Sequence, residues 1–186
     1  MKKILLILCL LFSLTASSQC VSNQSHVISP LAMYSPGQVV TVWYTLGNWW
    51  QLNLNWIIAF QINLGAGWTN LTTTNTPGNP GGSPGYWLWD LQNTFPSGLN
   101  FGPGWRFINS GTSAWGTSST GPFIISFQAT VAQTCTQDNL DITINVFGDC
   151  LTGGWSNGAC CSDPAYSIYN GVVQIVPPTT SPISHY

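Results

Sequence analysis

Nine consecutive residues decide the fold of this chain: FIISFQATV, residues Phe123–Val131. Every second side chain in this stretch is apolar, namely Phe123, Ile125, Phe127, Ala129 and Val131. The intervening positions hold Ile124, Ser126, Gln128 and Thr130. A hydrophobic period of two is typical of a β-strand with one side in a core, because successive side chains point to opposite faces.

The same alternation appears in several other parts of the chain. Four segments repeat it clearly: 38–46, 56–64, 140–146 and 173–175. Weaker strand patterns cover 26–33, 68–73, 86–91 and 104–109. In 56–64 we expect the buried face to consist of Trp56, Ile58, Phe60, Ile62 and Leu64. No segment places its apolar residues at helical spacing, so we predict almost no helix.

Glycine and proline separate the predicted strands. The chain has 19 Gly and 12 Pro, which cluster in turns such as Ser35-Pro36-Gly37. About eight or nine short strands with such turns predict an all-β, two-sheet antiparallel β-sandwich, either immunoglobulin-like or jelly-roll. We expect this single domain to span residues 19–176, with a long flexible loop at 76–85 and a flexible Pro-rich tail at 177–186.

Residues 1–18 have the pattern of a secretory signal peptide. Two lysines precede an apolar run at 4–14, and small residues stand three and one positions before the expected cleavage site. The mature chain would begin at Gln19 and be secreted or extracellular, with cell-surface attachment left open. A lipoprotein with Cys20 as the lipidated residue is an alternative, although Gln19 is not the small residue that such a site has. No later segment is apolar enough to cross a bilayer.

The chain carries very little charge. Only 4% of its residues are charged, compared with about 25% in an ordinary soluble domain. Without the signal peptide it keeps one cation, Arg106, and five aspartates, so the formal net charge is 1 − 5 = −4. Nucleic acids and anionic membrane surfaces are bound by clustered Lys and Arg, so this composition argues against both as partners.

Five cysteines remain after cleavage, and export makes disulfide bonds their expected use: Cys20, Cys135, Cys150, Cys160 and Cys161. Cys150 and Cys160 enclose a short glycine-rich loop and form a reasonable pair. The adjacent Cys160 and Cys161 should reach two different partners. Cys20 can pair with Cys161, with Cys135 or with another chain.

Few side chains are available for catalysis or metal binding. Glycoside hydrolysis needs two carboxylates about 5 to 9 Å apart, whereas Asp138 and Asp149 flank a predicted strand longer than that. We interpret these two and Asp141 as solvated turn acids, too few for a typical calcium site. A nucleophile needs a histidine base and zinc needs His or C-x-x-C ligands, but the mature chain has only His26 and His185. We therefore expect no enzyme activity, cofactor or metal.

Tryptophan carries the strongest functional signal. Four of the ten Trp residues lie in predicted loops among Asn, Gly, Ser and Thr: Trp49, Trp50, Trp115 and Trp155. An exposed indole can stack on a sugar ring, and it is equally suited to anchor a protein contact. Structural packing is the alternative role for each of them. We expect other tryptophans beside Gly-rich turns to cap the ends of the sandwich: Trp68, Trp87, Trp89 and Trp105.

Six segments, taken in order, carry a family resemblance: QINLGAGWTN at 61–70, WLWD at 87–90, NFGPGW at 100–105, the strand at 125–131, GGWS at 153–156 and CSDP at 161–164. They resemble a Gly- and Trp-rich extracellular β-sandwich domain found at the N-terminus of many secreted Bacteroidetes proteins. Those proteins often carry a type IX secretion sorting domain or a gliding-motility-associated C-terminal domain. The resemblance spans roughly 20–176. It implies an extracellular location and a sandwich fold, with no catalytic residues to carry over.

These features together predict a secreted, non-catalytic interaction or adhesion module that binds surface glycan or protein through loop aromatics. The alternative is a self-assembling structural subunit of an extracellular filament or matrix. Lysine and other charges normally keep sheet edges apart, and the mature chain has no Lys. Its edges are therefore open to pairing or stacking with copies of the same chain.

Non-reducing peptide mass mapping of the exported protein tests the disulfide prediction. We expect at least one intrachain bridge among Cys135, Cys150, Cys160 and Cys161, because an oxidising compartment joins thiols that the fold brings together. Reduction before digestion is the control and should remove the cross-linked peptides. Exported protein with only free thiols would refute the disulfide interpretation.

Overall fold

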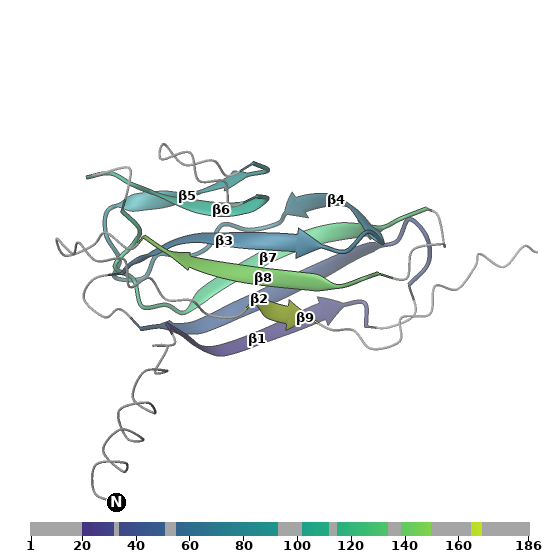
Figure 1. The fold of residues 1–186 in the computed structure, drawn as a ribbon, viewed down its shortest axis with the longest axis horizontal. Coiled ribbons are helices and arrows are strands. Elements are labelled where there is room, and N and C mark those ends of the chain that lie inside the picture. The colour runs from purple at the N-terminus through teal and green to yellow at the C-terminus, as the bar shows by residue number, and fades with distance from the viewer. Residues whose placement is uncertain are drawn as a thin grey trace, which may run out of the picture.

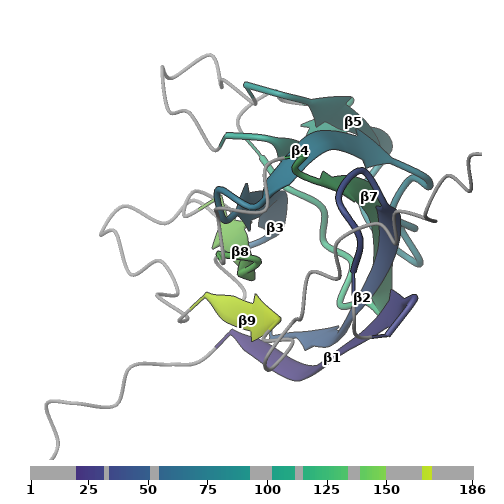
Figure 2. The ribbon, with the colours of Figure 1, turned by 90° about the vertical axis from the view of Figure 1, so that its right-hand side faces the viewer.

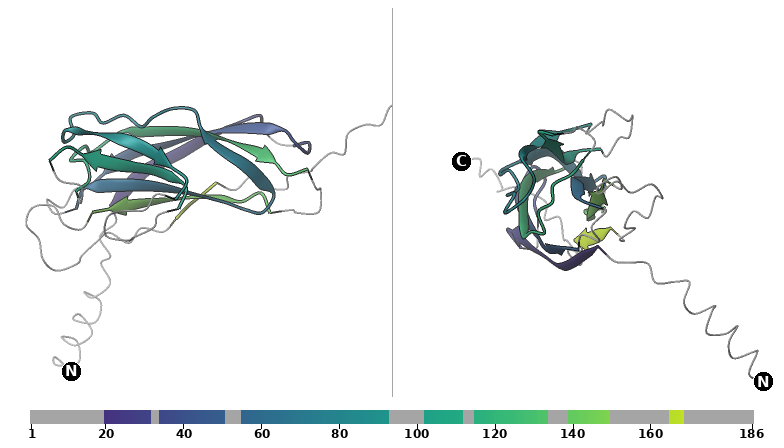
Figure 3. Two further views of the ribbon diagram at one scale, coloured as in Figure 1. Left: turned by 90° about the horizontal axis from the view of Figure 1, so that it is seen from above. Right: turned by 90° about the vertical axis from the view of Figure 1, so that its left-hand side faces the viewer.

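The computed structural model describes residues 20–31, 34–50, 55–92, 102–111, 115–133, 139–149 and 165–168. These residues form nine β-strands and no helix. The strands run along the long axis of the molecule (Figure 1), and the end views show them arranged around a common interior (Figures 2 and 3). The predicted all-β fold with two antiparallel sheets is confirmed.

Sheet A has four strands in the order β1-β2-β7-β4, and all its neighbours are antiparallel. Its strands are β1 (Val21–Ser29), β2 (Val39–Trp49), β7 (Phe123–Val131) and β4 (Trp68–Thr73). Phe123–Val131, the strand with the clearest alternation, is therefore an interior strand. It pairs with β2 on one side and β4 on the other.

Sheet B has five strands in the order β5-β6-β3-β8-β9, again all antiparallel. Its strands are β5 (Gly85–Asp90), β6 (Gly104–Asn109), β3 (Ile57–Leu64), β8 (Ile142–Gly148) and β9 (Tyr166–Ile168). The three-residue β9 was not predicted, because so short a strand shows no period. The described part of the chain contains no helix long and apolar enough to cross a membrane.

Most predicted strands lie close to the observed ones. The expected first strand at 26–33 is shifted, since β1 begins at Val21 and ends at Ser29. Pro30 follows directly, and proline cannot donate a backbone hydrogen bond to continue a ladder. The strand expected at 173–175, the signal peptide and the C-terminal tail lie outside the described residues.

The core lies between the two sheets and is rich in aromatic rings. The ring centroid of Phe60 in β3 lies 6.4 Å from that of Tyr44 in β2 and 5.8 Å from that of Phe123 in β7. Phe60 therefore joins the two layers. Trp87 of β5 packs 5.2 Å from Phe60. Tyr44, Phe60 and Phe123 are fully buried, and Trp87 is 5% exposed. Such rings contribute both buried apolar area and favourable edge-to-face contacts.

A β-bulge interrupts the alternation at the start of β3. The register between β3 and β8 shifts between Ile57 and Ala59. Ile57 joins the main core, whereas Ile58 and Ala59 form a separate cluster with Phe147. The expectation that Trp56 and Ile58 share the inward face is therefore wrong, because the extra residue reverses the side chains that precede it.

The segment predicted as a flexible loop at 76–85 is tied to the body by hydrogen bonds. Trp87 Nε1 donates to the carbonyl oxygen of Gly78 at 3.2 Å. Ser119 Oγ donates to the carbonyl oxygen of Pro80 at 2.8 Å, and Thr117 Oγ1 donates to Asn79 Oδ1. The segment is a loop up to the start of β5, as predicted, and side chains outside it satisfy several of its polar groups.

The buried Tyr34 and the partly buried Tyr166 predict a loss of stability in alkali. Burial raises the pKa of Tyr34 and of Tyr166 above the ordinary 10.0. The unfolded chain therefore loses these protons first, so their contribution to stability is complete below pH 10 and is lost as pH rises through the folded-state pKa. We expect the free energy of unfolding, measured in urea, to fall above pH 10. A Tyr34→Phe/Tyr166→Phe variant should show a shallower fall, and an unchanged fall would contradict the assignment.

Candidate functional site

Three tryptophans lie at the end of the sandwich where β2 ends, β3 begins and β8 ends (Figure 1). Trp50 directly follows β2, and Trp56 directly precedes β3. Trp115 packs against Trp56. We call this region, defined by Trp50, Trp56 and Trp115, the tryptophan end.

Trp50 is exposed and held in place. Its side chain is 59% exposed. Its backbone N–H donates to the carbonyl oxygen of Cys20 at 2.8 Å, and its indole Nε1 donates to Ser22 Oγ at 3.0 Å. Both N–H groups of the residue are thus used within the protein. The ring is ordered before any partner arrives, which lowers the entropic cost of contact through its apolar surface.

Trp49 does not occupy the exposed loop that the sequence analysis expected. It is the last residue of β2 and only 1% exposed. Its indole Nε1 donates to the carbonyl oxygen of Asn55 at 3.0 Å, and its backbone N–H donates to that of Thr120 at 2.8 Å. The expected loop placement is wrong because β2 continues past the clear alternation that ends at Leu46. Trp49 therefore belongs to the core.

Trp56 and Trp115 form an edge-to-face pair. Their ring centroids are 5.6 Å apart and their planes are inclined by 88°. Both side chains are half-buried. Trp115 was a predicted surface residue and remains accessible, whereas Trp56 was assigned to the core. The pair therefore presents two indoles at mutually perpendicular angles beside the bulge in β3.

Asp149 organises the backbone beneath this pair. Its carboxylate accepts hydrogen bonds from the N–H of Trp56 at 3.1 Å and from the N–H of Gly116 at 2.8 Å. Its own N–H donates to the carbonyl oxygen of Trp56 at 2.8 Å. Asp149 is only 8% exposed, so its interpretation as a solvated turn acid is wrong. Asp141, by contrast, is exposed and immediately precedes β8.

The remaining predicted site residues are only partly covered by the structure. Trp155 and the cysteines Cys135, Cys150, Cys160 and Cys161 lie outside the described residues. Cys20 is buried and disulfide-bonded, and Asn55 Nδ2 donates a hydrogen bond to its sulfur at 3.8 Å. The pairing of the cysteines therefore stays a prediction.

Three further tryptophans pack inside the protein and leave only small fractions exposed: Trp68 at 5%, Trp87 at 5% and Trp105 at 1%. Trp105 stacks edge-to-face on Trp89 with centroids 4.6 Å apart. Trp68 Nε1 donates to the carbonyl oxygen of Leu140 at 2.9 Å. These three tryptophans therefore have a packing role, but Trp87 contacts Phe60 and Phe123 in the core between the sheets rather than capping an end of the sandwich.

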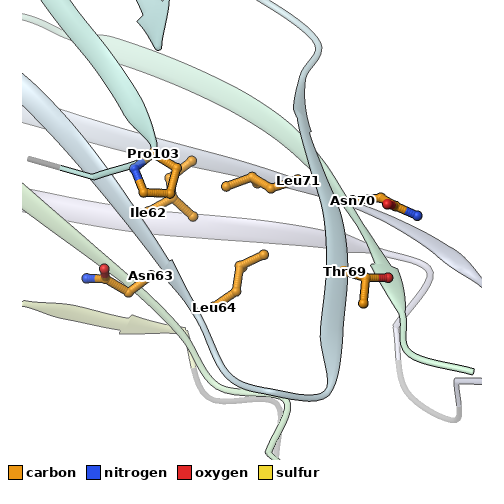
Figure 4. Close-up of a pocket in the computed structure, with 7 residues that line it drawn as sticks. All are labelled: Ile62, Asn63, Leu64, Thr69, Asn70, Leu71 and Pro103. Carbon is orange, nitrogen blue, oxygen red and sulfur yellow. The ribbon is translucent and has the colours of Figure 1, made fainter. Parts of the chain in front are cut away.

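A small pocket lies between β3 and β4, and Figure 4 shows its lining. Its volume is about 370 Å³. Ile62, Leu64 and Leu71 point into the space between the two strands, whereas Asn70 points away (Figure 4). Asn70 has a positive φ of 51°, and the β4–β7 register shifts between Thr69 and Thr72. The shift is a bulge that turns Leu71 toward the core.

The pocket was missed because alternation alone does not locate a bulge. The one sequence signal was Asn70 inside a strand pattern, since Asn tolerates the left-handed conformation better than most residues. The lining residues carry no charge and include Pro103, so they offer apolar contact rather than acid–base chemistry. Within the described residues, no group of three or more His, Cys, Asp or Glu side chains could hold a metal ion.

Replacing Asp149 tests its role at the tryptophan end. In Asp149→Asn one accepting oxygen becomes an NH₂ donor facing a backbone N–H, so one hydrogen bond is lost. We expect the free energy of unfolding in urea to fall by about 1–3 kcal/mol, with a changed near-ultraviolet circular dichroism signal from the tryptophans. Asp141→Asn is the matched control and should leave both quantities unchanged. Equal effects of the two substitutions would argue against the organising role.

Comparison of the chain with known proteins adds no functional assignment. No protein-family model, curated protein or solved structure matches it. Inference about function therefore rests on three features of the structure. These are the exposed aromatic rings, the hydrogen bonds that hold them, and the distribution of charged residues.

Proposed function

We propose that this protein is a secreted, non-catalytic interaction module that binds glycan or protein at a cell surface through the tryptophan end. The observation that carries the proposal is Trp50, which is 59% exposed while both of its N–H groups are already used. A rigid, exposed aromatic ring is the common anchor of both carbohydrate stacking and protein contacts.

The surroundings of Trp50 support binding better than chemistry. The half-buried pair of Trp56 and Trp115 adds aromatic surface at the same end. Asp149 lies beside this pair, and its carboxylate already accepts hydrogen bonds from two backbone N–H groups, those of Trp56 and Gly116. A general acid or base must be able to reach a substrate proton, and this carboxylate is committed to the backbone instead.

Location outside the cell is part of the proposal. The signal-peptide pattern at 1–18 and the absence of Lys and Glu from the mature chain support it. The resemblance to the Gly- and Trp-rich domain of secreted Bacteroidetes proteins points to the same compartment. The solubility of the mature chain must rest on neutral polar side chains, namely Asn, Gln, Ser and Thr. Such side chains form hydrogen bonds with hydroxyl groups, so a ligand rich in hydroxyl groups is chemically compatible with this surface.

A glycan array and a protein pull-down with the mature chain test the proposal. We expect Trp50→Ala to lower binding at least about tenfold, because a buried aromatic anchor is worth more than about 1 kcal/mol. Trp43→Ala is the matched control, since Trp43 is a 39% exposed tryptophan in the middle of β2 and away from the tryptophan end. Its ligand binding should be unchanged.

Two results would contradict the proposal. One is unchanged binding when Trp50→Ala and Trp115→Ala are combined in a variant that still folds. The other is an equal loss of binding in Trp50→Ala and Trp43→Ala. Trp49→Ala is not informative about binding, because Trp49 is 1% exposed and its removal would disturb the core.

The alternative function, a self-assembling structural subunit, is favoured by a separate observation. The strands of sheet A contain no Asp, Glu, Lys or Arg. Charge is one of the devices that keep sheets from associating. The surface of sheet A therefore lacks that protection.

A further inference from the structure

Each sheet of the sandwich ends in two edge strands, which have a neighbouring strand on one side only. They are β1 and β4 in sheet A and β5 and β9 in sheet B. The backbone N–H and C=O groups on the open side of an edge strand can pair with a strand of another chain. These four edges are therefore where strand pairing between molecules can occur.

Three of the four edges are poor templates for a further strand. β9 has only three residues. Asn23 in β1 has a φ of 55°, and Asn70 in β4 has a φ of 51°. A residue in this left-handed region breaks the run of extended backbone and turns the neighbouring peptide groups out of line. Both edges of sheet A are thus interrupted.

The fourth edge, β5, is long and regular. It lies at the outer margin of sheet B, beside β6 and away from β9 (Figure 1). Its six residues pair with β6 without a register shift. The strand contains no Lys, Arg or Pro, which commonly protect an edge, and its one charged residue, Asp90, stands at its end.

The backbone groups on the open side of β5 are unused. The N–H of Ser110 donates to the carbonyl oxygen of Pro84, which fixes the phase of the β5–β6 ladder. Hydrogen-bonded and non-hydrogen-bonded pairs alternate in such a ladder, so the backbone groups of Gly85, Trp87 and Trp89 point to the open side. Within the described part of the chain, no hydrogen bond to these outward groups is found.

We propose that β5 pairs antiparallel with β5 of a second copy of this chain, so that a two-fold symmetric dimer joins the two five-stranded sheets. This goes beyond the ligand-binding proposal, because it uses the backbone of β5 rather than the tryptophan end. The identity of the occupant follows from the register in which two copies of this strand match.

A two-fold axis at Trp87 satisfies every outward group at once. Trp87 then pairs with Trp87 of the second copy, and Gly85 pairs with Trp89 of the second copy at both ends of the ladder. Each hydrogen-bonded pair in an antiparallel ladder exchanges two N–H···O bonds, so the three pairs give about six. A shift of two residues in either direction would leave one of these pairs unformed.

The same register brings exposed apolar side chains together. Tyr86 lies opposite Leu88 of the second copy, and symmetry repeats this pair. Tyr86 is 59% exposed and Leu88 is 38% exposed in the single chain. Non-hydrogen-bonded positions hold side chains closest together, and pairs of aromatic and aliphatic residues there stabilise a sheet.

Charge is compatible with this register and with a dimer as its end point. Asp90 falls opposite Pro84 of the second copy, six residues from the other Asp90, which is about 20 Å. That separation exceeds the screening length of about 8 Å at physiological salt. Pro84 has no N–H, so the ladder ends there. Because pairing occupies β5 of both copies and the other edges are short or interrupted, the assembly stops at two chains.

Disulfide trapping tests the register. Mature Tyr86→Cys and Leu88→Cys proteins are mixed and oxidised with glutathione disulfide. We expect a covalent dimer in which peptide mapping joins position 86 of one copy to position 88 of the other, because Cα atoms of such a pair lie about 4.5 Å apart. Each variant oxidised alone is the matched control. Its introduced thiols are diagonal neighbours, about 7–8 Å apart between Cα atoms, so its yield should be at least about fivefold lower.

Sedimentation velocity of the mature, oxidised wild type from micromolar to millimolar concentration tests the dimer itself. We expect a shift from monomer to dimer, and Tyr86→Lys should raise the dissociation constant about tenfold, since symmetry removes two side-chain pairs. Leu88→Ser repeats the test if that variant folds poorly. Trp43→Lys, at a 39% exposed position of β2, is the matched control and should dimerise like the wild type. Trp50→Ala should do the same, which separates this interface from ligand binding.

Three results would each overturn the proposal: a wild type that stays monomeric at millimolar concentration, equal trapping in the mixture and in the single variants, or equal weakening by Tyr86→Lys and Trp43→Lys. A strand from a different protein is the competing occupant. A monomeric wild type whose binding of a partner protein is lost in Tyr86→Lys and kept in Trp43→Lys would assign the edge of β5 to that partner instead.

Discussion

The contact of Phe60 with rings from the opposite sheet is the interaction on which the two-layer structure depends. Phe60 lies on β3 in sheet B, while Tyr44 and Phe123 lie on neighbouring strands of sheet A. The described residues include a single cation, Arg106, so ionic contacts can add little. Burial of apolar area, both aromatic and aliphatic, and hydrogen bonds must therefore provide most of the non-covalent stability.

The same dependence on neutral groups shapes the surface. The tryptophan end is ordered by one buried carboxylate that accepts two backbone N–H groups, and by an indole N–H that donates to Ser22. The outer face of sheet A is ordered by amide and hydroxyl bonds such as that between Gln128 and Thr41. At the tryptophan end, Trp50 presents an exposed ring whose indole N–H is already engaged, which suits contact with neutral, flat partners.

Alternation predicted the interior strands well and the ends of strands poorly. Phe123–Val131 has the same bounds in the sequence pattern and in the structure, because both of its neighbours enforce the period of two. Trp56 and Trp49 were misplaced for opposite reasons. A bulge after Ile57 turns Trp56 out of the core, and the unforeseen continuation of β2 carries Trp49 into it. Hydrogen bonds between distant residues, such as Ser119 with Pro80, are equally invisible in a local pattern.

The sequence by itself determined the class of fold and the scarcity of charge, since side-chain periodicity and composition are local properties of the chain. It also indicated that tryptophan would matter at the surface, and Trp50 and Trp115 remain accessible. Only the tertiary structure decided which of the described indoles are covered, that Asp149 is buried, and that the four charged residues among the described ones lie in sheet B or at its ends. The reason is physical: exposure depends on which strands pair and where a bulge reverses their faces, and those contacts join residues far apart in the chain.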